Sequence, residues 1–391
     1  MKPNRLLLLL AALPAALAAH ADLASLFTNV PPAARIAPAR RPSIIVIQCH
    51  GLAPGDLSCY GQTNFQTPNL DQLAAAGIRF THYTGGADSA ATIAQLLAGN
   101  NAVPADGAAN LAQRLQQNGY HTGLIGEWGL GGEPWKLGFD EFAGFLDDAA
   151  AQNYFPDALW RYAPNSVIDT NNRVTAYIGK EMLYPNTGGK KGEYLPALFV
   201  NAMDNFVQIN VPDLANHYRP FFLLVNFPAP RTATSGADDF PVPSDAPFSD
   251  EPWPQAAKNR AALITRLDGG IGRLFEQLHK VGMTNNVAVF FTSSSAPEKF
   301  ADTNLDFLLP AGAFRNSKNP APVPLPMIVK WPGNIPAGRV SAAPWNAVDF
   351  APTALEIGYV KPAASFTGIS ILPVLLGAPG TNAPALPDRP F

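Results

Sequence analysis

The chain has 391 residues, of which 47% are hydrophobic and 15% are charged, so it can bury the core of one large α/β domain or of two smaller ones. Its formal net charge of -3 excludes the basic balance that is typical of proteins binding nucleic acid or anionic membrane surfaces, and we expect no nucleic acid among its partners. The two cysteines, Cys49 and Cys59, either pair, as in many exported proteins, or stay as packed thiols.

The N-terminal residues are typical of a secretory signal peptide. Lys2 and Arg5 flank the start of an apolar stretch that runs from Leu6 to Ala18, and Ala19-His20-Ala21 is a small-x-small cleavage site. We predict that residues 1–21 are removed and that the protein is exported, to the periplasm or outside the cell. A membrane-retained anchor is the alternative, but the apolar stretch is shorter than the roughly 20 residues of a spanning helix. No later segment is long and apolar enough to span, so we expect no membrane span after cleavage.

The remaining sequence predicts strands that alternate with helices. A Pro/Ala-rich lead, residues 22–40, precedes Ile44-Ile45-Val46-Ile47, a β-branched run that indicates a strand buried on both faces. Further strands are predicted at residues 121–125, 221–227, 287–292 and 327–331, and helices at residues 69–76, 90–97, 111–118, 258–281 and 351–357. This alternation favours an α/β fold with a mainly parallel central sheet and helices on both faces, in one domain over residues 41–377. A Pro-rich tail, residues 378–391, follows.

Several segments resemble the sulfatase family of the alkaline phosphatase superfamily, and in particular bacterial secreted arylsulfatase-like proteins. They include Gly55-Asp56-Leu57-Ser58, Thr67-Pro68-Asn69-Leu70-Asp71 and Met327-Ile328-Val329-Lys330-Trp331-Pro332-Gly333. The resemblance extends over nearly the whole mature chain and implies the same fold. It also implies that relatives continue into a small C-terminal subdomain, which we expect to be missing here. A truncated fold of this kind would leave a flank of the sheet for a partner protein to cover.

The resemblance implies a sulfuric ester hydrolase with one divalent cation, but the metal-ligand positions are degenerate. They fall on His50, Gly51, Ser294 and Ser295, where relatives carry carboxylate or amide side chains. Imidazole is a poor ligand for calcium, glycine has no side chain, and hydroxyls are weak neutral ligands. We therefore expect no cofactor, or one Ca²⁺ or Mg²⁺ ion if the protein is active. Asp56 is interpreted as a turn-forming carboxylate rather than a replacement ligand.

The resemblance places Ser89 at the nucleophile position. Ala91 and Ile93 stand where the family motif C/S-x-P-x-R has proline and arginine, so oxidation of Ser89 to formylglycine is not expected. The segment Asp88-Ser89-Ala90-Ala91-Thr92 also resembles the serine nucleophile segment of alkaline phosphatases. The alternative is that Ser89 only caps the helix over residues 90–97.

The positions that bind sulfate in relatives are partly kept. Glu127 replaces a sulfate-binding lysine, which reverses the charge and would repel an anion. Arg231 and Arg315 remain as candidate substrate-binding residues, with Lys318 close behind, because guanidinium groups grip sulfate or carboxylate groups in bidentate fashion.

Two functions remain for the chain as a whole. The favoured one is a catalytically inactive sulfatase-like protein that binds an acidic or sulfated carbohydrate, or a partner protein. The alternative is an active sulfuric or phosphoric ester hydrolase in which Ser89 attacks the ester and a rebuilt metal site uses His50, Asp56 and Glu127. The lost carboxylates and the altered nucleophile motif favour the first function, since each supplies a large part of the rate enhancement.

Overall fold

The computed structural model describes residues 40–168, 174–233, 240–297 and 324–377. The predicted signal peptide, almost all of the lead, the Pro-rich tail, Arg315 and Lys318 lie outside these residues. From Arg41 onward the chain forms one compact unit.

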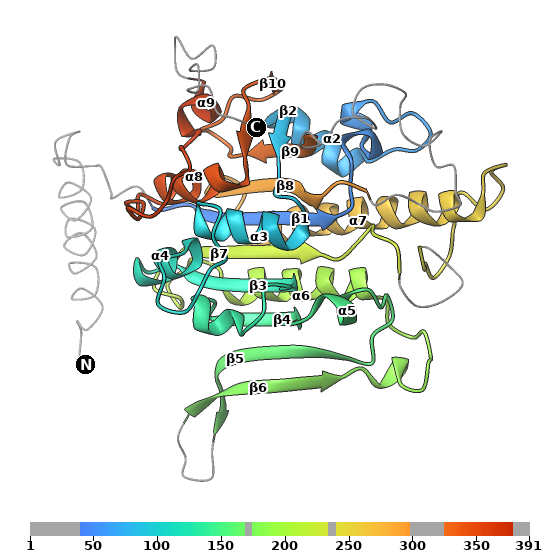
Figure 1. Ribbon diagram of the computed structural model, residues 1–391, viewed down its shortest axis with the longest axis horizontal. Helices are drawn as coiled ribbons and strands as arrows, with labels where there is room; N and C mark the ends of the chain where they lie inside the picture. Colours follow the sequence, from blue (N-terminus) through green and yellow to red (C-terminus); the bar gives the residue numbers. More distant parts are fainter. Residues whose placement is uncertain (1–39, 169–173, 234–239, 298–323, 378–391) are drawn as a thin grey trace, which may run out of the picture. The chain divides into compact units, whose positions relative to one another are not determined.

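A single mixed sheet runs through this unit in the order β10-β2-β9-β8-β1-β7-β3-β4-β5-β6, with β11 beside β2 (Figure 1). Its central strands β8, β1, β7, β3 and β4 are parallel, whereas β9, β5 and β6 extend it by antiparallel pairs. The α/β fold class is therefore confirmed, with antiparallel additions on both sides of a parallel centre. The strands are β1 Ser43–His50, β2 Ile78–Thr84, β3 His121–Glu127, β4 Glu141–Phe145, β5 Ala158–Ile168, β6 Val174–Met182, β7 Phe221–Phe227, β8 Val287–Ser295, β9 Pro324–Lys330, β10 Arg339–Ser341 and β11 Trp345–Asn346.

The two faces of the sheet are covered by separate sets of helices. In β1 every residue is buried, because alternate side chains enter two different cores. Ile45 and Ile47 pack with α2, α6 and α7, and Ile44 and Val46 pack with α3, α4 and α8. The helices are α2 Pro68–Ala75, α3 Ser89–Ala98, α4 Leu111–Gln117, α5 Asp148–Ala151, α6 Leu195–Ile209, α7 Gln255–Lys280, α8 Phe350–Ile357 and α9 Leu372–Leu376.

The elements predicted from the sequence are all present, with bounds that differ by a few residues. The β5–β6 hairpin, helix α6, the strands β2 and β4 and the short elements β10, β11, α5 and α9 were not predicted. Both cysteines are free thiols, with Cys49 buried and Cys59 half-buried, so the packed-thiol alternative holds. Among the helices that the structure describes, none combines the length and apolar character that crossing a membrane requires.

Candidate functional site

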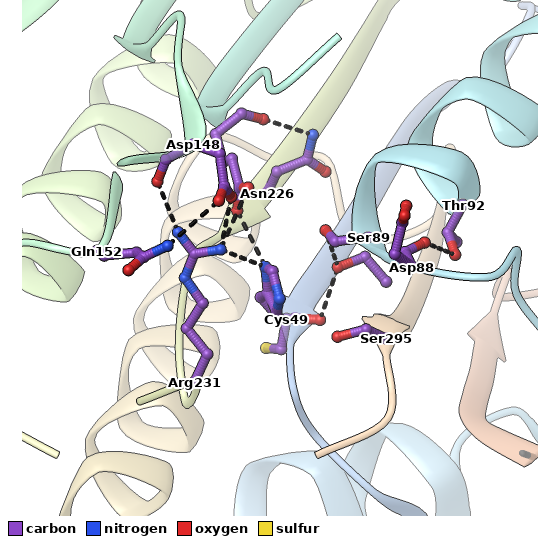
Figure 2. Close-up of polar contacts among 12 residues, drawn as sticks. Cys49, Asp88, Ser89, Thr92, Asp148, Gln152, Asn226, Arg231 and Ser295 are labelled. Atoms are coloured by element: carbon purple, nitrogen blue, oxygen red, sulfur yellow. Dashed lines mark hydrogen bonds and ion pairs between the residues drawn. The ribbon is translucent and has the colours of Figure 1, made fainter. Parts of the chain in front are cut away.

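Polar side chains gather where the central parallel strands end. His50 is the last residue of β1 and Glu127 the last of β3, while Ser294 and Ser295 end β8. Because parallel strands place their carboxyl ends at one edge of a sheet, these side chains meet there. Helix α3 begins at Ser89 on the same edge, and the loop after β7 brings in Arg231. Figure 2 shows Arg231 and Asp148 on one side of this region and Ser89 on the other, with Cys49 between them.

The guanidinium of Arg231 lies at the centre of a buried network. Its Nη1 donates to Oδ1 of Asp148 at 2.6 Å, and its Nη2 donates to the backbone carbonyl of Asp148 at 2.8 Å. Nη1 also lies 3.6 Å from Oε1 of Glu127 and 3.2 Å from Nδ1 of His50. Arg231 is only 3% exposed, so these groups, rather than water, solvate its charge.

His50 and Glu127 are in direct contact within this network. Nδ1 of His50 lies 3.2 Å from Oε2 of Glu127, the same distance as from Nη1 of Arg231. A protonated Nδ1 donates to Glu127, whereas an unprotonated Nδ1 accepts from Arg231, so the two contacts belong to different tautomers.

The two carboxyl groups of the network have opposite protonation preferences. Burial raises the pKa of Glu127, and the neighbouring Asp148 raises it further, against the lowering effects of His50 and Arg231. A hydrogen bond with Glu127 lowers the pKa of Asp148, and the ion pair with Arg231 adds to this effect. Asp148 is therefore the carboxyl group of the pair that ionises more readily, and it is the one that forms the short ion pair with Arg231.

His50, Glu127 and Asp148 can also be viewed as a metal-binding group, since their ligand atoms lie within 4.8 Å of one another. These residues do not fit a Ca²⁺ or Mg²⁺ ion, which needs several hard oxygen ligands around an open position. They offer one imidazole and two carboxyl groups, and Arg231 already occupies the space between them. The Arg231 guanidinium thus supplies the positive charge in this cluster.

The other three degenerate ligand positions differ in their surroundings. Ser294 Oγ lies 2.7 Å from Ser89 Oγ and donates to the carbonyl of Cys49 at 3.3 Å. Gly51 has a φ of 82°, a backbone conformation that favours glycine. Ser295 Oγ is buried without a hydrogen-bond partner in the described part of the chain.

Ser89 is the first residue of α3 rather than its cap. Asp88 is the N-cap residue, and its Oδ1 accepts from the backbone nitrogen of Ala91 at 2.7 Å, so the alternative in which Ser89 only caps this helix was wrong. Ser89 is 5% exposed. Among the described residues, the hydrogen-bond partner of its hydroxyl is Ser294. A hydroxyl lacks the basic character of the groups that activate serine nucleophiles.

Asp56 belongs to a second buried ion pair and not to the cluster around His50. Its Oδ2 accepts from the backbone nitrogen of Ala53 at 2.7 Å, which confirms the turn-forming interpretation. The same oxygen accepts from Nη2 of Arg260 at 2.7 Å. Arg260 also donates to the carbonyls of Gly51 at 3.1 Å and Pro230 at 2.8 Å. This arginine therefore joins the loops that follow β1 and β7.

The structure brings together most of the site residues named from the sequence. His50, Glu127 and Arg231 form one cluster, and Ser89 and Ser294 form a second contact beside it. Asp148 was missed, although Asp147-Asp148, one residue beyond the Phe142–Phe145 segment, is a polar signal at a strand end. Arg231, which we predicted to bind a substrate anion, pairs with Asp148 in the structure.

A sequence model of the family described as Sulfatase matches residues 42–358, and the chain belongs to this family. The chain is 28% identical to arylsulfatase A of Bos taurus over 88% of this chain and 70% of the relative. It is 26% identical to N-acetylgalactosamine-6-O-sulfatase of Bacteroides thetaiotaomicron over 78% of this chain and 70% of the relative. These matches confirm the resemblance stated above.

Solved structures confirm the fold. The crystal structure of Ps i-CgsB matches with a TM-score of 0.66 at 24% identity, covering 86% of this chain and 76% of that chain. The PsFucS1 sulfatase from Pseudoalteromonas sp. matches with a TM-score of 0.67 at 23% identity, covering 86% of this chain and 72% of that chain.

Proposed function

We propose that this chain is a non-hydrolysing member of the sulfatase family that binds an acidic or sulfated carbohydrate. The observation that carries the proposal is the position of Arg231, whose buried guanidinium is enclosed by His50, Glu127 and Asp148. A fixed internal cation of this kind cannot exchange ligands with a substrate oxygen. The cluster therefore stabilises the fold at the edge where family members perform chemistry.

The surroundings of Ser89 support the absence of hydrolysis. Attack on a sulfate ester needs an activated nucleophile and positive charge at the ester oxygens. The Ser89 hydroxyl is paired with the Ser294 hydroxyl, and the charge of the nearby arginine is balanced by Asp148. The loss of a single transition-state donor costs on the order of 10²–10³ in rate, so these changes together bring turnover below detection.

The ligand class is supported by the relatives. Among them are proteins called arylsulfatase and N-acetylgalactosamine-6-sulfatase. Solved neighbours include one in complex with its substrate D-Glucosamine-2-N,6-O-disulfate and one in complex with k-i-k-neocarrahexaose. This chain shares the fold of these proteins although its metal-ligand and nucleophile positions differ, which supports a carbohydrate as its ligand. Export through the predicted signal peptide, residues 1–21, would bring the protein to such glycans.

The test is hydrolysis of aryl sulfate and aryl phosphate esters by the purified chain. Each ester is incubated with Ca²⁺, Mg²⁺, Zn²⁺ or a chelator, beside Ser89→Ala and the control Ser58→Ala, which lies in a separate hydrogen-bond cluster with Thr67 and Asp71. We expect no turnover above Ser89→Ala in any metal. Metal-dependent turnover that Ser89→Ala abolishes and Ser58→Ala keeps would overturn the proposal and establish an ester hydrolase.

A further inference from the structure

An aromatic surface lies on one face of the β5–β6 hairpin. Trp160 and Tyr162 are two residues apart on β5, so their side chains emerge on the same face. In the strand register Trp160 pairs with Lys180 of β6 and Tyr162 pairs with Ile178, which places all four side chains together. We call this set, together with Trp135 and Met182, the hairpin platform.

The rings of the platform are ordered against one another. The ring of Trp135, in the short helix Pro134–Leu137, stacks on that of Tyr162 with centroids 5.0 Å apart and planes inclined by 20°. Nζ of Lys180 lies 5.6 Å from the centroid of Trp160, a cation–π contact. The three aromatic residues are half-buried and their apolar neighbours are more open, with Ile178 51% exposed and Met182 46% exposed. The aromatic side chains pack on one side against the core beneath α3, α4 and α8, and the open part of the platform is the neighbouring row of Ile178, Lys180 and Met182. Exposed apolar groups gathered beside partly open aromatic rings mark an interaction surface.

Strand pairing connects the platform to the candidate site. Gln48, Asn226, Gly126, Gly144, Trp160 and Lys180 form one continuous row of register partners across six strands. Gly126 directly precedes Glu127 of the buried network. Since neighbouring strands are about 4.8 Å apart, Trp160 lies only about 10 Å along this row from β3. The platform is therefore continuous with the edge at which sulfatase-family chemistry takes place.

The chemistry of the platform fits an acidic sugar better than a protein. The electron-rich faces of aromatic rings attract the weakly positive C–H bonds on the flat side of a sugar ring. Lys180 provides an exposed ammonium group for a sulfate or carboxylate on the same sugar. A second copy of the chain, or another protein, would need roughly 20–30 residues a side, far more than this surface offers. The net charge of -3 argues against a nucleic acid.

We propose that the hairpin platform binds a sulfated or carboxylated sugar unit, with Trp160 against the sugar ring and the exposed Lys180 side chain moved from over that ring to the anionic group. This inference rests on the proposed function and gives it a binding surface outside the degenerate catalytic position. It also accounts for carbohydrate binding without a free charge on Arg231.

The experiment is calorimetric titration of the purified chain with a chondroitin 6-sulfate hexasaccharide and a sulfated carrageenan hexasaccharide, each beside its desulfated form. We expect Trp160→Leu to weaken binding about tenfold or more and Trp160→Phe, which keeps a ring, to weaken it less. Lys180→Gln should weaken binding of both sulfated sugars and leave that of the desulfated carrageenan, which carries no anionic group, unchanged. The matched control Arg161→Gln, between the two aromatic residues of β5 but on the opposite face, where Arg161 pairs with Glu181, should change affinity by less than about twofold. Thermal unfolding of each variant separates lost binding from lost folding.

Each contrary result has a distinct meaning. If the wild-type chain binds the sulfated hexasaccharides and folded Trp160→Leu and Lys180→Gln bind them equally well, the platform inference fails and the proposed function stands. If the wild-type chain binds neither hexasaccharide, this inference and the proposed ligand class both fail. If sedimentation shows a dimer that Ile178→Asp converts to a monomer, the platform is a contact between copies and the inference is overturned.

Discussion

Arg231 is buried and its ion-pair partner Asp148 is not. The Arg231 side chain is 2% exposed and that of Asp148 is 54% exposed, yet Nη1 and Oδ1 are 2.6 Å apart. The arginine extends from the loop after β7 into the protein interior. Asp148, in the first turn of α5, contacts it from the solvent side. This arrangement places a positive charge beside the His50–Glu127 contact and pairs it with a carboxylate from the solvent side.

Removing the guanidinium should destabilise the fold. We expect Arg231→Gln to lower the free energy of unfolding by about 2–3 kcal/mol, less than for a fully buried pair because Asp148 is partly hydrated. Urea denaturation measures the change. The matched control is Arg273→Gln, whose pair with Asp204 is exposed on the arginine side and should contribute less than about 1 kcal/mol. Equal effects of the two substitutions would show that the buried network has no special role.

The wild-type chain should be indifferent to divalent cations. Because Arg231 occupies the space between the ligand atoms, we expect neither Ca²⁺ nor a chelator to shift the thermal unfolding midpoint. Arg231→Ala should leave His50, Glu127 and Asp148 available for a transition metal, which accepts mixed nitrogen and oxygen ligands. Visible absorption of added Co²⁺ reports such binding, and Arg231→Ala/Asp148→Asn serves as control. A rise in the wild-type midpoint with Ca²⁺ would contradict this account.

The pH dependence of stability should reflect the raised pKa of Glu127. A carboxyl group whose folded pKa is raised contributes stability below its unfolded pKa, about 4.3, and loses it as pH rises through the folded pKa. Glu127→Gln removes this titration. The free energy of unfolding of Glu127→Gln minus that of the wild type should therefore increase from pH 4 to pH 8. Urea denaturation at several pH values measures it, and a difference that stays flat or decreases would mean that Glu127 is ionised in the folded protein.

The Asp56–Arg260 pair should matter more for stability than the Arg231 network. Asp56 is fully buried and Arg260 is 2% exposed, so Arg260→Leu leaves a carboxylate in the core without its cation. We expect a loss of about 3–5 kcal/mol in the free energy of unfolding. The double variant Asp56→Asn/Arg260→Leu should recover part of it, since the uncompensated charge is gone. A double variant that is less stable than Arg260→Leu would show that Asp56 acts mainly through the Ala53 turn.

Most of the fold could be predicted because local patterns match burial directly. The β-branched run Ile44–Ile47 lies in a strand that is buried on both faces. The apolar residues at helical spacing in residues 258–281 lie on the buried face of α7: Leu263, Leu267, Ile271 and Leu274. Helix α6 has the same helical spacing of apolar residues, although it was not among the predicted helices: Leu195, Phe199, Met203 and Phe206. The β5–β6 hairpin gives less signal, because it is an antiparallel extension with one half-exposed face.

The site could be predicted only in part, because its contacts depend on distant segments meeting. Position within the family pattern was enough to single out His50, Ser89, Glu127 and Arg231. The pairing of Arg231 with Asp148 joins residues 83 positions apart, and that of Arg260 with Asp56 joins residues 204 apart. No local pattern encodes which carboxylate an arginine meets across two strand-end loops. The charge balance of the cluster therefore required the folded structure.

Gln48 provides a test of whether the parallel centre of the sheet tolerates a polar group without compensation. It is 1% exposed, and neither atom of its amide has a hydrogen-bond partner among the residues that the structure describes. Replacing it with the similarly shaped, apolar methionine removes the cost of a buried unpaired amide. We expect Gln48→Met to raise the free energy of unfolding by about 1–2 kcal/mol, measured by urea denaturation. The control Asn226→Leu should lower it, because Asn226 Nδ2 donates to the Glu127 carbonyl at 3.0 Å. A loss of stability in Gln48→Met would mean that the amide has a bound partner, such as an ordered water, which the methionine cannot hold.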